Sequence, residues 1–315
     1  MTTQSTQSVL INGFGLLFVI LNSFGLGLRI EVGKLLAEAY AHWKVAVWAL
    51  VINFVIIPLL FIGYLLTIAS SIPGEIKVGF CVAALCAGMP FAPLLAGLAK
   101  ANVGISTTLL VALTVGTVIA LPIGLPLAID AVDAQLKTSV WDVAWPLLLF
   151  FLLPLVLGCG FRVWWADLTP PLAHWIVRVA ILCLLFNLNF TLVAYWNQFV
   201  EEWGTESYIA AVAGPFIGLG CGYLLVSSLR VKDVGIRHAA EVTTAVRNIA
   251  PMLLMMIFPF GGDPLVTVSI TILNTVGVVT VLLFVLMWRR AASSSDTHAT
   301  TNQPAGEGLT PPTST

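Results

Sequence analysis

Long apolar segments recur along almost the whole chain, and the charged residues fall in the short stretches between them. A membrane-spanning α-helix needs about 20 mostly apolar residues. The pattern predicts such helices over residues 8–29, 43–69, 76–99, 103–129, 142–162, 172–197, 207–229, 235–259 and 264–288. We therefore expect an all-α membrane protein with about nine transmembrane helices.

Two further segments differ from these helices. Residues 31–42 (EVGKLLAEAYAH) place apolar side chains at helical spacing with charges between them, a pattern typical of a short amphipathic helix on the membrane surface. Residues 289–315 carry almost no large apolar side chain, which predicts a disordered tail. No soluble insertion interrupts residues 8–288, so we expect one transmembrane domain after a short N-terminal segment, residues 1–7.

Composition supports a membrane protein, because only 9% of the 315 residues are charged, against about 25% in soluble domains. With nine spans, one face of the membrane receives ten basic residues and the other only two, Lys77 and Lys137. The ten are Arg29, Lys34, Lys44, Lys100, Arg162, Arg230, Lys232, Arg237, Arg289 and Arg290. Cytoplasmic loops carry an excess of Lys and Arg. We therefore predict a multi-pass protein of the cell membrane with its N-terminus outside and its C-terminus in the cytoplasm.

Prolines repeat at nearly constant distance in two halves of the chain. Pro93 follows Pro90 in the third predicted helix, and Pro251 lies 158 residues after Pro93. Pro58 and Pro215 form a second pair at an offset of 157. An offset of this length contains five predicted helices. Because five is an odd number, the second copy of the repeat is inverted relative to the first in the membrane. This pattern predicts an inverted repeat whose third and eighth helices open near the bilayer centre and cross there.

Three segments resemble the bile acid:sodium symporter family. Residues 98–103 (LAKANV) resemble its "LAKGNV" run, and residues 53–58 (NFVIIP) resemble its "QFxxMP" helix. GYLL at residues 222–225, a short basic loop and VRN at 246–248 resemble the approach to its second crossing helix. The resemblance implies a nine-helix member, with a panel of helices 1, 5 and 6 beside a core of helices 2–4 and 7–9.

The resemblance also implies where this chain departs from the family. Sodium-coupled members carry Ser-Asn at the first crossing, where this chain has Ala92 and Pro93. They carry a Glu four residues before a Gln at the second crossing, where the matching positions are Thr243 and Arg247. A small cation needs a carboxylate and hard oxygen ligands. We therefore do not expect sodium coupling, and expect coupling to protons or none.

Arg247 is the strongest candidate for a site residue, because a charge about a dozen residues into a membrane helix usually faces a cavity or the protein interior. It could replace the missing cation, bind an anionic substrate, or pair with Glu241. Asn248, Thr243, Thr244 and Asn53 offer polar groups near the same crossing, either to a ligand or to neighbouring helices. The remaining candidates are the two prolines at the breaks, Pro93 and Pro251, and Asn187 in the middle of the sixth helix.

The function that these residues favour is secondary active or facilitated transport of a small organic anion, one that bears a carboxylate. The transporter would work by alternating access. A membrane receptor that keeps the fold but has lost transport is the alternative. An intramembrane enzyme is disfavoured, because the spans hold no paired carboxylates and no Ser/His or metal constellation. We expect no cofactor, no metal and no nucleic acid partner.

The charge distribution makes a topology prediction. A cysteine that replaces Thr3 should react with a membrane-impermeant thiol reagent from outside intact cells, and a cysteine that replaces Thr301 should not. Labelling of both positions from the same side would contradict the span count.

Overall fold

The computed structural model describes residues 2–301, and side chains are described for residues 7–290. Seven helical stretches in this part of the chain are long and apolar enough to cross a bilayer. They are α1 (Thr2–Arg29), α3–η1–α4 (Trp43–Val51, Ile52–Ile56, Ile57–Thr67), α7 (Val103–Ala131), α8–η2–α9 (Val140–Pro146, Leu147–Leu152, Leu153–Trp164), α10 (Thr169–Ala194), α12 (Glu206–Ser228) and α15 (Pro264–Thr301). The expectation of an all-α membrane protein is confirmed.

Two of the predicted helices are interrupted, and each consists of two shorter helices. The third segment forms α5 (Gly74–Leu85) and α6 (Ala92–Leu98), and the eighth forms α13 (Val234–Ala245) and α14 (Ile249–Ile257). Two short helices complete the described chain: α2 (Val32–Ala41), which covers the predicted amphipathic segment, and α11 (Trp196–Glu202).

The prolines at the two predicted openings lie at the start of new helices, whereas the other pair lies within continuous ones. Pro93 occupies the first turn of α6 and Pro251 the first turn of α14, where a missing N–H costs little because no intrahelical acceptor exists for it. The chain therefore opens just before each proline. Pro58 follows a π-helical turn, Ile52–Ile56, that keeps its helix continuous, and Pro215 lies inside uninterrupted α12.

The last helix continues past its predicted end at residue 288, as far as Thr301. The first proline after Trp288 is Pro304 and no glycine precedes it, so no residue of that stretch breaks a helix. The rest of the predicted tail, residues 302–315, lies outside the described residues.

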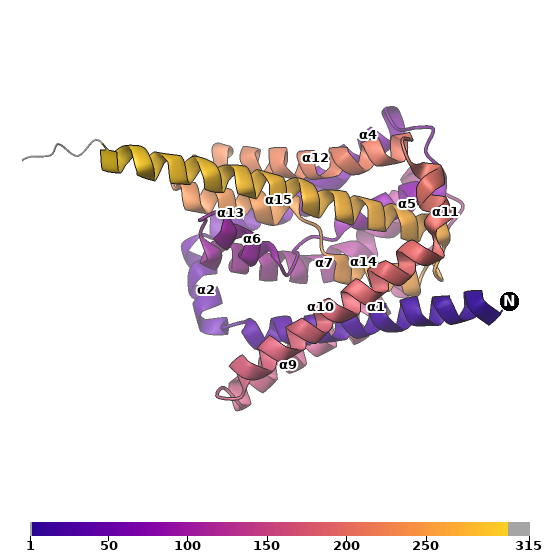
Figure 1. Ribbon diagram of the computed structural model, residues 1–315, viewed down its shortest axis with the longest axis horizontal. Coiled ribbons are helices and arrows are strands. Elements are labelled where there is room, and N and C mark those ends of the chain that lie inside the picture. Colours follow the sequence, from indigo (N-terminus) through magenta and orange to yellow (C-terminus); the bar gives the residue numbers. More distant parts are fainter. Residues whose placement is uncertain (1, 302–315) are drawn as a thin grey trace, which may run out of the picture.

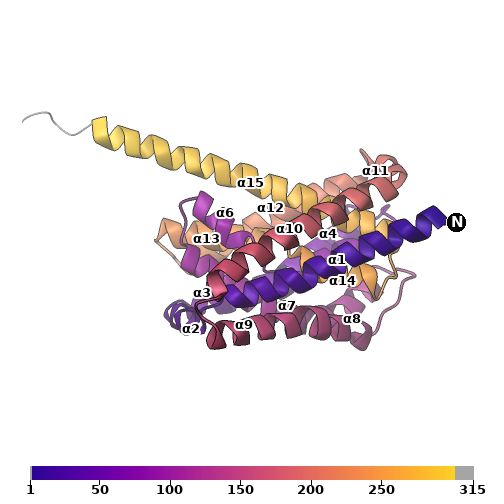
Figure 2. The ribbon, with the colours of Figure 1, turned by 60° about the horizontal axis from the view of Figure 1, so that its bottom comes forward.

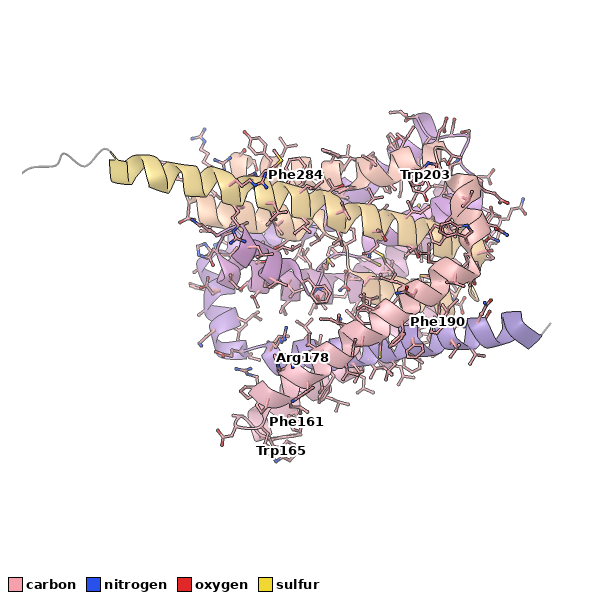
Figure 3. All side chains as sticks on the ribbon, viewed as in Figure 1. Phe161, Trp165, Arg178, Phe190, Trp203 and Phe284 are labelled. Atoms are coloured by element: carbon pink, nitrogen blue, oxygen red, sulfur yellow. The ribbon has the colours of Figure 1, made fainter. Side chains whose placement is uncertain are left out.

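The helices form two groups. α1 packs against both α9 and α10, and Figure 2 shows it running between them. On the other side, α12 packs against α13 and α15, and α15 packs against α5. Figure 1 shows the beginning of α1 and the end of α15 at opposite ends of the helix bundle. The aromatic residues Trp165 and Trp203 also lie at opposite ends, as expected for indole rings at two membrane interfaces (Figure 3).

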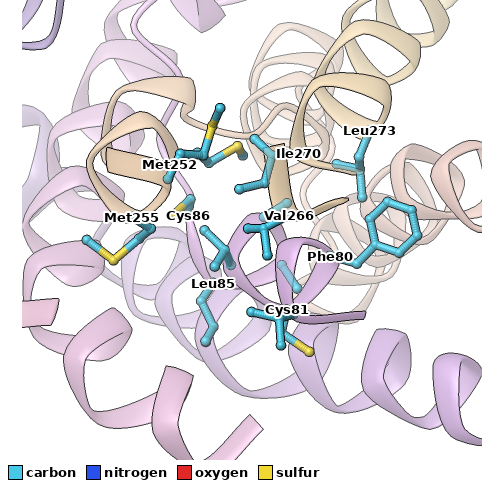
Figure 4. Close-up of a cluster of buried hydrophobic side chains, with 14 of the residues drawn as sticks. Phe80, Cys81, Leu85, Cys86, Met252, Met255, Val266, Ile270 and Leu273 are labelled. Carbon is cyan, nitrogen blue, oxygen red and sulfur yellow. The ribbon is translucent and has the colours of Figure 1, made fainter. Parts of the chain in front are cut away.

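The best-packed core lies where α14, α5 and α15 meet (Figure 4). Phe80 of α5, Met252 and Met255 of α14, and Val266 and Ile270 of α15 are buried together there. A Cβ atom on Gly79 would lie 2.9 Å from the carbonyl oxygen of Val266, so only glycine allows α5 and α15 to approach this closely. Close packing fixes α5 and α14, the two half-helices that lead to and from the chain breaks.

Glycine also sets the contact between α1 and α9. A Cβ atom on Gly158 would lie 2.3 Å from the carbonyl oxygen of Phe24 and 3.1 Å from the Cα of Gly27. These distances are too short for any side chain, and the clashing atoms belong to the backbone. The two helices therefore touch backbone to backbone at this point.

This contact gives a prediction with a control on the same helix. Gly158→Ala should lower the free energy of unfolding by roughly 1–3 kcal/mol, because the helices must separate to admit the methyl group. Gly160→Ala should be neutral or slightly stabilising, since the nearest atom, on Trp164, is 3.8 Å away. Thermal unfolding of the purified variants measures the difference, and equal midpoints would rule out the close contact.

Candidate functional site

The two interrupted helices meet through their extended segments. Ala87 and Arg247 pair as an isolated antiparallel β-bridge. The backbone N–H of Asn248 donates to the carbonyl oxygen of Cys86 over 2.9 Å. Each break therefore supplies hydrogen-bond partners to the other, because no water is present in the bilayer core to satisfy backbone groups.

Asn248 joins the two breaks with its side chain as well. Its Nδ2 donates to the carbonyl oxygen of Gly88 over 2.8 Å, and its Oδ1 accepts from the N–H of Ala250 as the N-cap of α14. The side chain is fully buried. Asn248 thus caps the N-terminus of α14 and also donates a hydrogen bond to the carbonyl oxygen of Gly88 in the other break.

Helix α7 supports the first break from the other side. The Thr117 hydroxyl accepts from the N–H of Ala87 and lies 3.1 Å from the carbonyl oxygen of the same residue. Gly88 has φ of +81°, and a Cβ there would lie 2.9 Å from the backbone of Leu110 and Thr114. Glycine is therefore required by both the backbone conformation and the space.

Arg247 is 9% exposed, and its guanidinium group bonds to carbonyl oxygens at both helix ends. Nη1 lies 3.3 Å from the carbonyl of Ala84, and Nη2 lies 2.8 Å from that of Thr244. Among the described residues no carboxylate forms an ion pair with it, so the pairing with Glu241 considered above is absent there. The guanidinium lines a pocket between α4, α5, α12 and α15.

The other predicted residues divide between the crossing and more distant places. Thr243 shares a hydrogen bond of 2.8 Å with Ser106 and also donates to Ala239 of its own helix. Thr244 and Asn53 are buried near the crossing, and the Thr244 hydroxyl and the Asn53 Oδ1 have no hydrogen-bond partner. Pro251 is fully buried in the first turn of α14.

Asn187 lies away from the crossing, on α10, where its Nδ2 donates to the carbonyl oxygen of Ile11 in α1 over 2.7 Å. It borders a small pocket between α1, α10 and α14. Pro93 borders a much larger cleft. The structure therefore does not gather the eight predicted residues into one site.

The large cleft lies between the two helix groups, with α1 and α10 on one side and α6 and α7 on the other. It holds a cavity of about 370 Å³ that is partly open to solvent. Its walls are mainly apolar: Leu26, Phe91, Leu94, Leu110, Val177 and Ile181. Clefts of this size and lining are typical of sites for small organic ligands.

Two polar side chains of α1 also line this cleft. Asn22 is buried, and its Nδ2 has no hydrogen-bond partner. Arg29 borders both this cleft and an adjoining one that reaches α2, and no carboxylate pairs with it in the described part of the chain. A free amide donor and a free cation in an apolar cleft are suited to bind a carboxylate.

Two neighbouring cations on this side, Lys34 and Arg162, are already paired. Glu31 forms ion pairs with Lys34 and with Arg162, whose Nη2 lies 2.7 Å from the carboxylate. The hydrogen bond from Lys34 holds the pKa of Glu31 below its ordinary value, so this carboxylate stays ionised. Because Lys34 and Arg162 share Glu31, Arg29 is left available to a ligand.

Sequence reasoning missed Asn22 and Arg29, although a signal was present. Together with Leu26 they stand at positions i, i+4 and i+7, which is one face of a helix. The pattern was hidden because Arg29 ends the apolar segment and so counted only as a topology marker.

The role of Asn248 can be tested against another asparagine in a transmembrane helix. Asn248→Ala should cost about 2–4 kcal/mol of stability, since it removes an N-cap and leaves a buried carbonyl without a donor. Asn189→Ala should have little effect, because Asn189 is exposed and bonds only to Leu185 of its own helix. Thermal unfolding of both purified variants measures this, and a stable Asn248→Ala protein would contradict the role assigned to the residue.

One comparison with known proteins identifies a protein family whose sequence model matches this chain. A model described as the sodium bile acid symporter family matches residues 16–202, more than half of the chain. The matched range includes the first interrupted helix, α5–α6, and ends before the second, α13–α14. No curated protein matches the sequence.

Proposed function

We propose that this chain, which belongs to the sodium bile acid symporter family, moves a small carboxylate-bearing anion through the cleft between its two helix groups, without sodium. Membership itself makes the chain a multi-pass membrane transporter of bile acids or similar organic anions, and not an enzyme. The finer statements are argued below from the cleft and from Arg247.

The observation that carries the proposal is the unpaired cation in the apolar cleft. Arg29 and Asn22 could bind a carboxylate with charge-assisted hydrogen bonds, while Leu26, Phe91 and Ile181 contact the apolar part of the ligand. Such a site selects amphipathic anions over inorganic ones.

The arrangement supports alternating access between a panel (α1, α8–α9 and α10) and a core (the remaining membrane helices). In this scheme the chain has nine spans in all, the core is an inverted repeat, and α5–α6 crosses α13–α14 near the midplane. The cleft borders α2 and the basic end of α1, so with the predicted orientation it opens to the cytoplasm. At the other end, Phe150 stacks on Phe258 of the core and Trp145 meets the same ring edge to face, with centroids 5.2 and 4.8 Å away; in this scheme these contacts close the outer side.

Independence of sodium follows from what occupies the crossing. Arg247 places a permanent positive charge against the carbonyl oxygens of Ala84 and Thr244, which are groups that a bound cation would otherwise contact. Thr243, which stands where sodium-coupled members carry a carboxylate, is bonded to Ser106 and Ala239. The two matching positions, Thr243 and Arg247, thus supply no carboxylate to a sodium ion, and the charge of Arg247 opposes a cation at this crossing.

Ligand-induced thermal shifts test the proposal directly. Purified protein should be stabilised by carboxylates in a series from acetate to cholate, more strongly as the apolar part grows. Arg29→Gln should weaken binding roughly 10-fold through loss of one charge-assisted hydrogen bond. Asn22→Leu should also weaken it without lowering the unfolding temperature of the ligand-free protein, because the Asn22 amide has no protein partner to lose.

The matched control is Arg178→Gln, which removes a cation of α10 that stacks on Trp175 outside the cleft. It should leave affinity unchanged. Replacing sodium by potassium should leave every shift unchanged. Absence of any carboxylate-induced shift, or a saturable requirement for sodium, would overturn the proposal.

A further inference from the structure

The charge of Arg247 is not neutralised by any group that the structure describes. Its two hydrogen bonds go to carbonyl oxygens, which are dipoles and carry no net charge. The nearby sulfur groups, Cys86 and Cys221, belong to free cysteines, and a thiol carries no negative charge. A buried cation without a counter-charge is strongly unfavourable in a low-dielectric surrounding.

An unfilled pocket adjoins this cation. It lies between α4, α12 and α15, separate from the cleft that contains Arg29, and the two share no lining residue. Gly277 opens the pocket, since a Cβ built there has no atom within 4 Å. The enclosed part has room for little more than one water-sized group, which is too small for an organic anion.

The pocket contains one further polar side chain, Asn274 of α15. No hydrogen bond involves its amide in the described part of the chain. The guanidinium supplies N–H donors and a positive charge that repels cations, and the Asn274 amide can turn its NH2 group toward a ligand, so together they suit an anion. The surrounding side chains, among them Phe61, Pro215 and Leu273, are apolar and would exclude water.

We propose that this pocket binds a monovalent inorganic anion of the size of chloride, held by Arg247 and Asn274. Where sodium-coupled relatives hold a cation beside a carboxylate, this chain holds a cationic side chain and takes the negative charge from solution. The proposal concerns the core alone, so it stands or falls independently of carboxylate binding in the cleft.

Thermal unfolding of the full chain in methanesulfonate buffer tests the site. Chloride or bromide should raise the unfolding temperature in a saturable way, because a ligand that binds only the folded state stabilises it. Sodium and potassium chloride should give the same curve. Added methanesulfonate at matched ionic strength, which is too large for the pocket, should not.

Two variants separate the pocket from a general salt effect. Asn274→Leu should weaken the halide effect about 10-fold or more, as expected for a lost hydrogen bond to a charged group. Gly277→Val should fill the empty space and abolish the effect, without a clash that would lower stability. Asn189→Leu, which alters an exposed amide on α10, should keep the wild-type halide curve.

The results overturn the proposal in either of two cases. One is the absence of a halide-dependent shift up to high concentration in the wild-type protein. The other is an equal shift in wild type, Asn274→Leu and Gly277→Val, which identifies general salt stabilisation or water as the only occupant. Anomalous scattering from bromide beside the Arg247 guanidinium would establish the site directly.

Discussion

The whole architecture depends on satisfying backbone hydrogen bonds where two helices are broken inside an apolar medium. An unpaired N–H or C=O costs several kcal/mol in the bilayer core. Here Asn248, Thr117 and the Arg247 guanidinium supply the partners, and the two breaks bond to each other through Asn248 and Cys86. Because these partners come from different elements, α5, α7, α13 and α14 must hold fixed positions relative to one another. The crossing is therefore a rigid centre, and any moving parts must lie outside it.

Much of this fold could be predicted from the sequence, because bilayer thickness and the apolar pattern determine where helices begin and end. Pro93 and Pro251 correctly marked the two breaks, and each lies in the first turn of the helix that follows its break. The partners of the breaks could not be predicted. In the sequence, Thr117 looks like any other threonine of a membrane helix. Only the structure shows that α7 brings its hydroxyl group within hydrogen-bond distance of the Ala87 backbone. The cleft was also missed, since Arg29 acquires a role only when α6 and α7 stand opposite α1.

Charge pairing distinguishes the cations that hold the structure together from those left for ligands. Arg162 bonds to Leu28 and pairs with Glu31, so it ties α9 to the end of α1. Arg29, one residue beyond Leu28, has no such acid and faces the cleft. Arg247 also has no carboxylate partner among the described residues. It is buried beside a pocket that only a very small group can enter. Arg29 and Arg247 thus favour different anions, one large and amphipathic at the cleft, the other small and inorganic in the core.

The surface between the two helix groups is compatible with the rocking motion that transport would require. Within the panel, polar and backbone contacts fix the helices: Asn187 bonds to Ile11, and Gly158 lies against Phe24. Between α1 and the core, by contrast, α14 presents Met256 and Ile257, and the unbranched side chain of Met256 adapts its packing easily. Specific hydrogen bonds across this surface would have to break in every cycle, whereas methionine and aromatic contacts can slide and re-form. Rigid contacts inside each group and adaptable contacts between them are what allows two bodies to move past each other without unfolding either one.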